Sequence, residues 1–390
     1  MRVLLVSHDF PPMLNSAARL MGELADDLRG AGHAVTVLTR WRRGERKRQG
    51  MRTARGLPLP RRVPGLRALD QLWLSLAMLW AGLRLPRQDA IIVYSPPLPL
   101  AAAALLLCRR WRCPLIANVQ DLYPRTAVEL GLLRGGPMLR LAERLESLLY
   151  RKAAALTVHS PGARDYVAAK GAPPERVHVV YNWIDLEAGA RADPDAWRAR
   201  HGLADAFLVT FAGTMGFAQD LRTVTDAAAL TASDPSVVWA LAGGGVMRGE
   251  VERAVRERNL TNVRLLPHQA PDDYHAMLRA SDAGLVTLSA SLTAPVTPGK
   301  AQALMAAGAP IVCAAHPSTD LKRLVEESGA GVFGEAGDAQ GLADAVLALR
   351  ADPARARRMA EAGRAFAAAR FDRRRATAAY EALLRSLAGE

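Results

Sequence analysis

Two glycine clusters stand where an anion can be bound. Phe211-Ala212-Gly213-Thr214-Met215-Gly216 follows one apolar run, and Leu241-Ala242-Gly243-Gly244-Gly245 follows the next. Glycine lets a backbone approach a phosphate and direct N–H groups at its oxygens. One glycine after a strand usually only forms a turn. Two clusters at neighbouring strand ends are more specific, because that edge of an open α/β sheet is where ligands bind.

A lysine lies at the start of a predicted helix. Thr297 can cap this helix, Pro298 suits its first position, and Lys300 falls in its first turn. A cation at this end opposes the helix dipole. The arrangement favours a bound anion, and a solvated surface lysine is the plain alternative.

Other chemical motifs are weak or missing. The sequence has no GxxxxGK[ST], strand-linked GxGxxG, HExxH or GxSxG pattern. Asp193-Pro194-Asp195 spells DxD, a pattern that holds a metal and a diphosphate in other enzymes, but here Asp193 is better placed to cap a following helix. Isolated histidines are more often structural than catalytic, and the scattered ones here are His8, His159, His268 and His275.

The elements that must position these residues follow from the hydrophobic pattern. Short runs rich in Val, Ile and Leu alternate with helix-period segments, which is typical of parallel strands covered by helices on both faces. Two such series predict two doubly wound α/β domains. The predicted strands are 3–7, 34–39, 90–94, 115–119, 156–159 and 177–181, and then 208–212, 237–241, 263–266, 284–288 and 311–314.

Helix spacing and capping residues occur in segments that flank these strands. Leu20, Leu24 and Leu28 recur at helical spacing and predict one buried stripe, with Ser16 as the N-cap. Asp352 can cap a helix over 354–369, and 373–387 is predicted as a last helix. The small polar stretch 187–195 marks the domain boundary.

The length and the net charge of the chain limit the number of domains and the classes of partner. A chain of 390 residues suits two or occasionally three domains. With 51 basic and 38 acidic residues the net charge is +13, which favours a nucleic acid, a membrane surface or a phosphorylated substrate. Most of the excess lies between Arg40 and Arg67, where only Glu45 opposes it.

The first apolar run is too short for a signal peptide. Spacing of the cysteines predicts reduced thiols of a cytosolic protein, namely Cys108, Cys113 and Cys313.

The segment 66–83 carries a continuous helical stripe of leucine and tryptophan. A spanning helix needs roughly 20 apolar residues, and Arg67, Asp70, Arg84 and Arg87 interrupt or close this one. An amphipathic helix beside a polybasic loop predicts contact with an anionic membrane through Arg40–Leu83. An ordinary helix packed on the sheet, beside a solvated loop, is the alternative.

Taken in order, motifs along about 370 residues resemble family-four retaining glycosyltransferases. Within that family they resemble the bacterial enzymes that build lipid-linked surface polysaccharide, including the L-fucosamine transferase type. The matching motifs are Phe10-Pro11-Pro12 with Arg19, 32–37, Ser95-Pro96-Pro97, Val119-Gln120-Asp121-Leu122-Tyr123-Pro124, 129–131, 160–162, Tyr181-Asn182-Trp183-Ile184-Asp185, the two glycine clusters, 266–269 and 298–312.

The resemblance implies an α/β fold of the GT-B type, with two Rossmann-like domains facing a cleft. The acceptor would bind to 1–187 and the donor nucleotide to 188–371, and 372–390 would cross back to the first domain. It implies catalytic roles for Asp121 and Lys300. Implied donor contacts are Gly213, Thr214, Gly216, Gly243, Gly245, His268, Gln269, Thr297, Gly299 and Gln302, and implied acceptor contacts are Asn15, Ser16 and Arg19.

The expected reaction moves a sugar from a UDP-sugar to a polyprenyl-diphosphate-linked saccharide. The sugar would be an N-acetylhexosamine or its 6-deoxy form, and no metal or nucleic acid would take part. The enzyme would work on the inner face of the bacterial cytoplasmic membrane.

The sequence departs from the family pattern at several positions. Where the family carries two carboxylates, this chain has Pro295 and Ala303, with Gln302 beside the second. Thr214 and Gln120 replace a common Arg and His. Two alternatives therefore stay open: a non-catalytic homologue that binds nucleotide or membrane, and a nucleotide-sugar epimerase.

Overall fold

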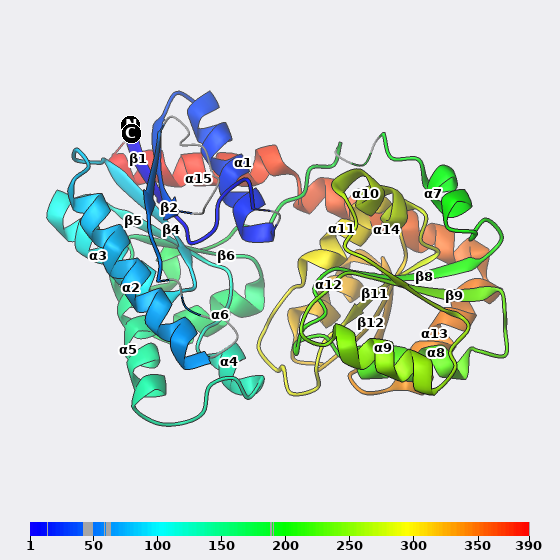
Figure 1. Ribbon diagram of the computed structural model, residues 1–390. Coiled ribbons are helices and arrows are strands. Elements are labelled where there is room, and N and C mark those ends of the chain that lie inside the picture. The colour runs from blue at the N-terminus through cyan, green and yellow to red at the C-terminus, as the bar shows by residue number, and fades with distance from the viewer. Residues whose placement is uncertain are drawn as a thin grey trace. The chain divides into compact units, whose positions relative to one another are not determined.

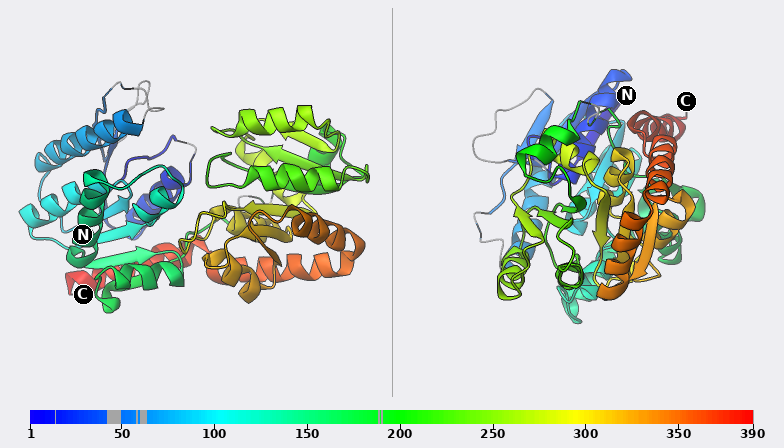
Figure 2. Two further views of the ribbon diagram at one scale, coloured as in Figure 1. Left: turned by 90° about the horizontal axis from the view of Figure 1, so that it is seen from below. Right: turned by 90° about the vertical axis from the view of Figure 1, so that its right-hand side faces the viewer.

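The computed structural model describes residues 1–13, 15–41, 50–57, 59, 64–187, 189 and 191–389. They form two compact units, each built around a parallel sheet with helices on both faces (Figures 1 and 2). Unit 1 comprises 1–182 and 374–390, and unit 2 comprises 183–373. The expected boundary after residue 187 falls just inside unit 2.

The sheet of unit 1 has seven strands in the order β3-β2-β1-β4-β5-β6-β7, all parallel. Its inner strands are mostly buried and rich in Val, Ile and Leu, as expected for strands that helices cover on both faces. The strands are β1 (Arg2–Val6), β2 (Ala34–Arg40), β3 (Met51–Ala54), β4 (Ala90–Ser95), β5 (Leu115–Val119), β6 (Ala155–Val158) and β7 (Val177–Val179).

Helices pack on both faces of this sheet. They are α1 (Ser16–Gly30), α2 (Pro64–Leu83), α3 (Leu98–Trp111), α4 (Arg125–Glu129), α5 (Pro137–Lys152), α6 (Pro161–Ala169), a 3₁₀ turn at Pro174–Arg176, and α15 (Arg373–Ala388). The predicted stripe of α1 is buried at Leu20, Leu24 and Leu28. The predicted cap is wrong by one residue, because Asn15 accepts from the Ala18 N–H at 2.8 Å and Ser16 is already helical.

The last helix belongs to the first unit. Tyr380 of α15 is fully buried, and its hydroxyl lies 2.9 Å from Thr157 Oγ1 of β6. Figure 1 shows α15, in red, beside the blue elements of unit 1.

The sheet of unit 2 has six parallel strands in the order β10-β9-β8-β11-β12-β13. The strands are β8 (Phe207–Ala212), β9 (Val237–Ala242), β10 (Val263–Leu266), β11 (Ala283–Thr287), β12 (Ile311–Ala315) and β13 (Gly331–Glu335). The helices are α7 (Pro194–Arg200), α8 (Leu221–Leu230), α9 (Arg248–Glu257), α10 (Pro271–Arg279), α11 (Gly299–Ala307), α12 (Asp320–Ser328), α13 (Ala339–Ala351) and α14 (Pro353–Arg370). Phe211 and Trp239 are fully buried in its core.

The doubly wound fold class is confirmed, and every predicted strand is present. Two edge strands, β3 and β13, were not predicted. Each carries arginine or glycine where the inner strands are rich in Val, Ile or Leu, because an edge strand is paired on one side only.

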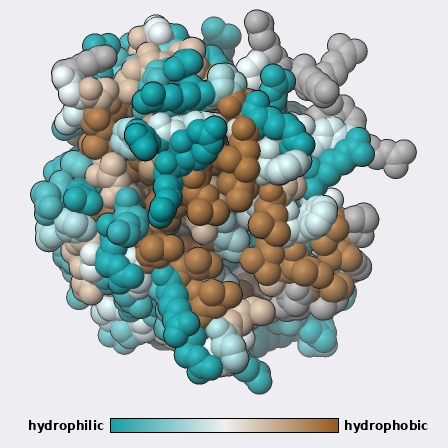
Figure 3. All heavy atoms as spheres, turned by 90° about the vertical axis from the view of Figure 1, so that its left-hand side faces the viewer, coloured by the Kyte–Doolittle hydropathy of each residue, from teal (hydrophilic) through white to brown (hydrophobic). Residues whose placement is uncertain are grey.

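Helix α2 leaves its apolar stripe in solvent. Trp73, Leu76 and Trp80 are 49%, 63% and 63% exposed, whereas Leu74 and Met78 are buried. Figure 3 shows apolar side chains gathered on this face among hydrophilic ones. Among the described residues, no helix is long and apolar enough to cross a membrane.

The prediction that Asp70 interrupts the apolar stripe of this helix is wrong. Asp70 does not interrupt the exposed stripe, because it is buried and pairs with Arg40 at 2.6 Å. Arg40 is therefore neutralised inside the unit and adds nothing to a membrane-facing charge. The basic residues at 42–48 and at 61–62 lie outside the described residues.

Candidate active site

The two glycine loops of unit 2 lie edge to edge. Gly213 N–H donates to Ala242 O at 3.0 Å, and Met215 N–H donates to Gly244 O at 2.8 Å. Gly243 has a φ of +137°, and a Cβ there would lie 1.9 Å from Gly213 O. Glycine is thus required by both backbone conformation and space. The loops form a continuous rim at the carboxyl ends of β8 and β9.

Several amides on this rim are unused. Within the part of the chain that the structure describes, the N–H groups of Thr214, Gly244 and Gly245 donate no hydrogen bond. Gly216 differs, because its N–H donates to Gln219 Oε1 at 3.1 Å. The free donors are groups that a phosphate oxygen accepts from.

Lys300 lies against the same rim. A Cβ on Gly213 would be 2.8 Å from Lys300 Cε, so the lysine stem passes directly over the first glycine. Lys300 Nζ is 3.5 Å from the centroid of the Phe211 ring. The amine is buried without a hydrogen-bond partner among the described residues, and burial lowers its pKa to about 7. An anion would supply the missing partner and favour the charged form.

The helix that carries Lys300 starts later than predicted. α11 begins at Gly299, and Pro298 is its N-cap without a side-chain bond, so the prediction that Thr297 caps it is wrong. Lys300 remains in the first turn. Gln302 is 2% exposed, and its Nε2 has no partner among the described residues. The buried amine of Lys300 is therefore followed, two residues later, by a buried side-chain amide that also lacks a hydrogen-bond partner among the described residues.

The rim continues at β10 and holds an arginine that the sequence analysis missed. Beyond β10, His268 is exposed and Gln269 is half-buried. Both bond to their own loop, with Gln269 Nε2 donating to Pro267 O at 2.9 Å. Arg248, the first residue of α9, donates to the carbonyls of Gly243 and Leu266. It ties the ends of β9 and β10 together. Its only sequence signal is a position shortly after the second glycine cluster.

The matching edge of unit 1 carries carboxylates. Asp121 follows β5 and is exposed. It does not cap a helix, since α4 starts at Arg125. Asp9 follows β1 and was missed by the sequence analysis, although its place at a strand end was visible. Burial raises the pKa of Tyr94 in β4, and the charges of Asp121 and Asp9 raise it further.

The predicted acceptor residues serve partly to hold the loop after β1. Asn15 caps α1, and its Nδ2 donates to Asp9 Oδ2 at 3.0 Å. Arg19 pairs with Glu23 along α1 at 2.9 Å. Asp9 and Asn15 are therefore linked at the edge that also carries Asp121.

A pair of amides closes this edge near the end of unit 1. Gln120 Nε2 donates to Asn182 Oδ1 at 2.9 Å, and Asn182 Nδ2 donates back to Gln120 Oε1 at 2.8 Å. The glutamine that stands where the family has a histidine thus fixes Asn182, the last residue of unit 1 before the chain enters unit 2.

The DxD pattern is a helix start. Asp193 Oδ1 accepts from Ala196 N–H at 3.0 Å and caps α7, as the local sequence predicts. No group of three potential metal ligands occurs among the described residues.

Two family models match the chain in succession. "Glycosyl transferase 4-like domain" matches residues 16–183, and "Glycosyl transferases group 1" matches residues 193–366. A similar curated protein is the putative colanic acid biosynthesis glycosyl transferase WcaI of Escherichia coli (strain K12), 26% identical over 84% of this chain and 86% of the relative. The probable glycosyltransferase WbjE of Pseudomonas aeruginosa is 23% identical over 68% of this chain and 67% of the relative.

Solved structures share the architecture. Anabaena Alr3699/HepE, crystallised with UDP, superposes with a TM-score of 0.76 at 19% identity, over 99% of this chain and 100% of that chain. Two parallel-sheet units with a glycine rim in the second define a GT-B glycosyltransferase. The chain belongs to the family-four glycosyltransferases and resembles their bacterial surface-polysaccharide members.

Proposed function

We propose that the enzyme is a retaining transferase of surface polysaccharide biosynthesis. It takes an N-acetylhexosamine, or the 6-deoxy form, from a UDP-sugar and adds it to a polyprenyl-diphosphate-linked saccharide. The named role of the WcaI relative supports the polysaccharide, and the UDP held by HepE supports the donor class. Unit 2 binds the donor and unit 1 the acceptor, on the cytoplasmic side of the membrane.

The observation that carries the proposal is the buried amine of Lys300 beside free glycine amides. A diphosphate on the rim pairs with the Lys300 ammonium and accepts from the N–H groups of Thr214 and Gly244. These groups stabilise charge on the leaving diphosphate, so we propose no metal requirement. Gln302 takes the place of the family's carboxylate and donates its buried amide to the ribose.

Retention is proposed to follow front-face attack. The acceptor oxygen bonds to the anomeric carbon on the face from which the diphosphate departs. The carbon–oxygen bond to the diphosphate breaks, and the acceptor proton passes to a leaving phosphate oxygen. Asp121 orients the acceptor hydroxyl. The helix α2, with its exposed tryptophans, rests on the anionic membrane that holds the acceptor.

The test is transfer from a panel of UDP-, GDP- and dTDP-sugars, with membrane extract as the acceptor source. We expect lipid-dependent release of UDP. Lys300→Ala should lower kcat by about 100- to 1,000-fold, as loss of one preorganised charge donor does. Thr293→Ala, also in the loop before α11, is the control and should retain activity.

Each contrary result has a distinct meaning. Equal activity of Lys300→Ala and the unmodified enzyme would remove that residue from the site. Conversion of the donor alone into an epimeric sugar would replace transfer by epimerisation. Saturable nucleotide binding without turnover on any lipid acceptor would favour the non-catalytic alternative.

A further inference from the structure

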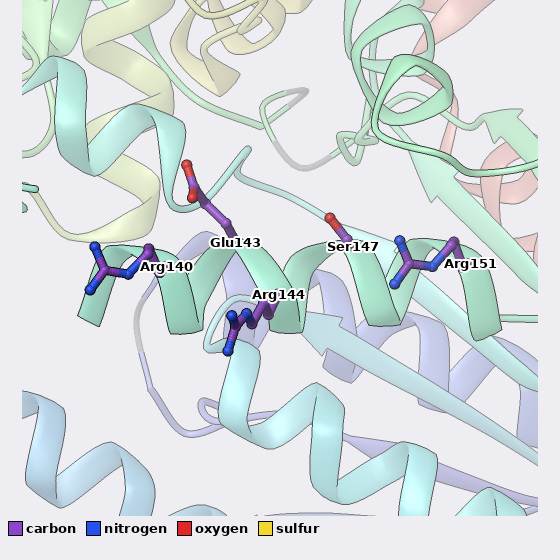
Figure 4. A pocket seen from close by; sticks show the side chains of 5 residues that line it. All are labelled: Arg140, Glu143, Arg144, Ser147 and Arg151. Carbon is purple, nitrogen blue, oxygen red and sulfur yellow. The ribbon is translucent and has the colours of Figure 1, made fainter. Parts of the chain in front are cut away.

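A row of arginines on α5 forms an open groove in unit 1. Arg140, Arg144, Ser147 and Arg151 recur at helical spacing and line a groove of about 310 Å³ together with Glu143 (Figure 4). Eleven residues of helix make this row roughly 16 Å long. The row belongs to unit 1, whereas the glycine rim belongs to unit 2.

Some arginines of the chain are neutralised by ion pairs. Arg125, Arg198 and Arg258 each meet an acidic side chain. Among the described residues, Arg140, Arg144 and Arg151 have no acidic partner within ion-pair distance. Three guanidinium groups therefore face solvent against one carboxylate, that of Glu143. An uncompensated row of this kind attracts phosphate oxygens.

The same helix exposes apolar side chains beside the row. Met138, Leu141 and Leu148 are 56%, 53% and 38% exposed. The opposite face of α5 is fixed in the unit by Leu149 and Tyr150, both 1% exposed. The exposed side of α5 thus combines a cationic stripe with an apolar one.

This surface joins the stripe of α2. Helix α3 packs against both α2 and α5, and it adds the exposed Leu106 together with Arg109 and Arg110. On α2, the Arg84 guanidinium lies 4.1 Å from the centroid of the Trp80 ring. On this side of the molecule, hydrophilic side chains border apolar ones (Figure 3).

We propose that the α5 row binds the phosphates of anionic phospholipid headgroups, which extends the membrane contact beyond Arg40–Leu83. A bilayer surface presents phosphate and acyl chain side by side. A soluble phosphorylated ligand or a nucleic acid would satisfy the arginines and leave Met138, Leu141 and Leu148 in water. This inference rests on the membrane association proposed above, and it assigns the charge recognition to α5.

The test is flotation of the full chain with phosphatidylcholine vesicles, with and without phosphatidylglycerol. Arg140→Gln/Arg144→Gln/Arg151→Gln should lower the partition coefficient on anionic vesicles by roughly 100-fold, at about five-fold per arginine. Partition on phosphatidylcholine alone should not change. Glu143→Gln should strengthen anionic binding a few-fold, a direction that mere disruption of the helix does not give.

The matched control removes the same charge elsewhere. Arg355→Gln/Arg357→Gln/Arg358→Gln on α14 changes three exposed arginines of unit 2 and should bind as the unmodified chain does. An equal loss in this control would overturn the α5 assignment in favour of net charge. Displacement of the chain from vesicles by dissolved inorganic diphosphate would overturn it in favour of a soluble ligand.

Failure of this inference is distinguishable from failure of the proposed function. If Trp73→Ser/Trp80→Ser loses binding while the α5 variant keeps it, α5 is not the phosphate site and the α2 contact stands. Sugar transfer from UDP-sugars is measured separately, and the α5 variant should retain donor hydrolysis in detergent.

Discussion

Lysine is rare in this chain, which gives Lys300 its weight. Of the 51 basic residues only five are lysines, namely Lys47, Lys152, Lys170, Lys300 and Lys322. An arginine stays charged in any protein site, whereas a buried lysine can release its proton. The basic residue that is buried beside the Phe211 ring is thus a lysine, which can be neutral in such a site.

We predict that nucleotide binding depends on pH through this residue. The pKa of Lys300 is about 7, so the free enzyme carries the charge below that pH and loses it above. Binding of UDP above it must take up a proton, and affinity should fall by up to about tenfold per pH unit between about pH 7 and 9. Calorimetric titration of UDP across this range measures the slope.

The control for this prediction is Lys300→Met, whose UDP affinity should be low and independent of pH. Stability offers a second readout. The unfolded chain holds the lysine proton up to about pH 10 and the native state only to about 7, so the unfolding free energy should rise with pH in that window. If the unfolding free energy of Lys300→Met rises with pH as steeply as that of the unmodified enzyme, another group is responsible for the titration.

Candidate site residues could be recognised in the sequence where residue type and position together indicate a chemical role. The glycines were singled out because two clusters follow neighbouring strands, and Lys300 because a cation in the first turn opposes the helix dipole. Asp9 and Arg248 were missed, because one acid after a strand and one arginine at a helix start are common. Their importance comes from contacts with Asn15 and with the carbonyl of Gly243, which sequence spacing does not encode.

At the scale of elements, the paired glycine loops allow a matched comparison. A methyl group on Gly243 would lie 1.9 Å from Gly213 O, whereas one on Gly244 meets nothing within 4 Å. We expect Gly243→Ala to lower the unfolding free energy by about 1–3 kcal/mol and to weaken UDP binding, because the two loops must part. Gly244→Ala should change stability by less than about 0.5 kcal/mol.

Urea unfolding of the two variants, with UDP titration alongside, decides the matter. Equal stability of Gly243→Ala and Gly244→Ala would mean that the loops are not held edge to edge.

Elements buried on both faces were the easiest to predict. The inner strands are rich in Val, Ile and Leu, so they can be recognised in the sequence without knowledge of how they pack. Helix α2 shows the limit: its period was clear, but the partnership of Asp70 with Arg40 joins residues 30 positions apart. A charge inside an apolar stripe looks like an interruption until its partner is located in space.

At the scale of the whole molecule, two sheets were predictable because the strand series repeats after a polar stretch. The assignment of the last helix to unit 1 came only from the family resemblance. Nothing in the composition of α15 says which sheet it covers. Its buried face, formed by Ala376, Thr377, Tyr380 and Leu384, fits either sheet in principle.

Removing residues 374–390 should therefore destabilise unit 1 and spare unit 2. The truncation uncovers the surface that Tyr380 and Leu384 bury, and it leaves Thr157 without its hydroxyl partner. We expect differential scanning calorimetry to show one transition lowered and the other unchanged. Tyr380→Phe, which removes only the hydrogen bond, should cost about 1 kcal/mol. A truncated chain whose transitions both match the full chain would contradict the contact.

The position of α15 also bears on how the chain is made. Unit 2 is a single continuous stretch and can close as soon as it leaves the ribosome. Unit 1 is translated first but must wait, with the apolar surface beneath α15 uncovered, until the final helix emerges. Chaperones should thus bind nascent chains that lack α15 more strongly than chains from which α15 has emerged.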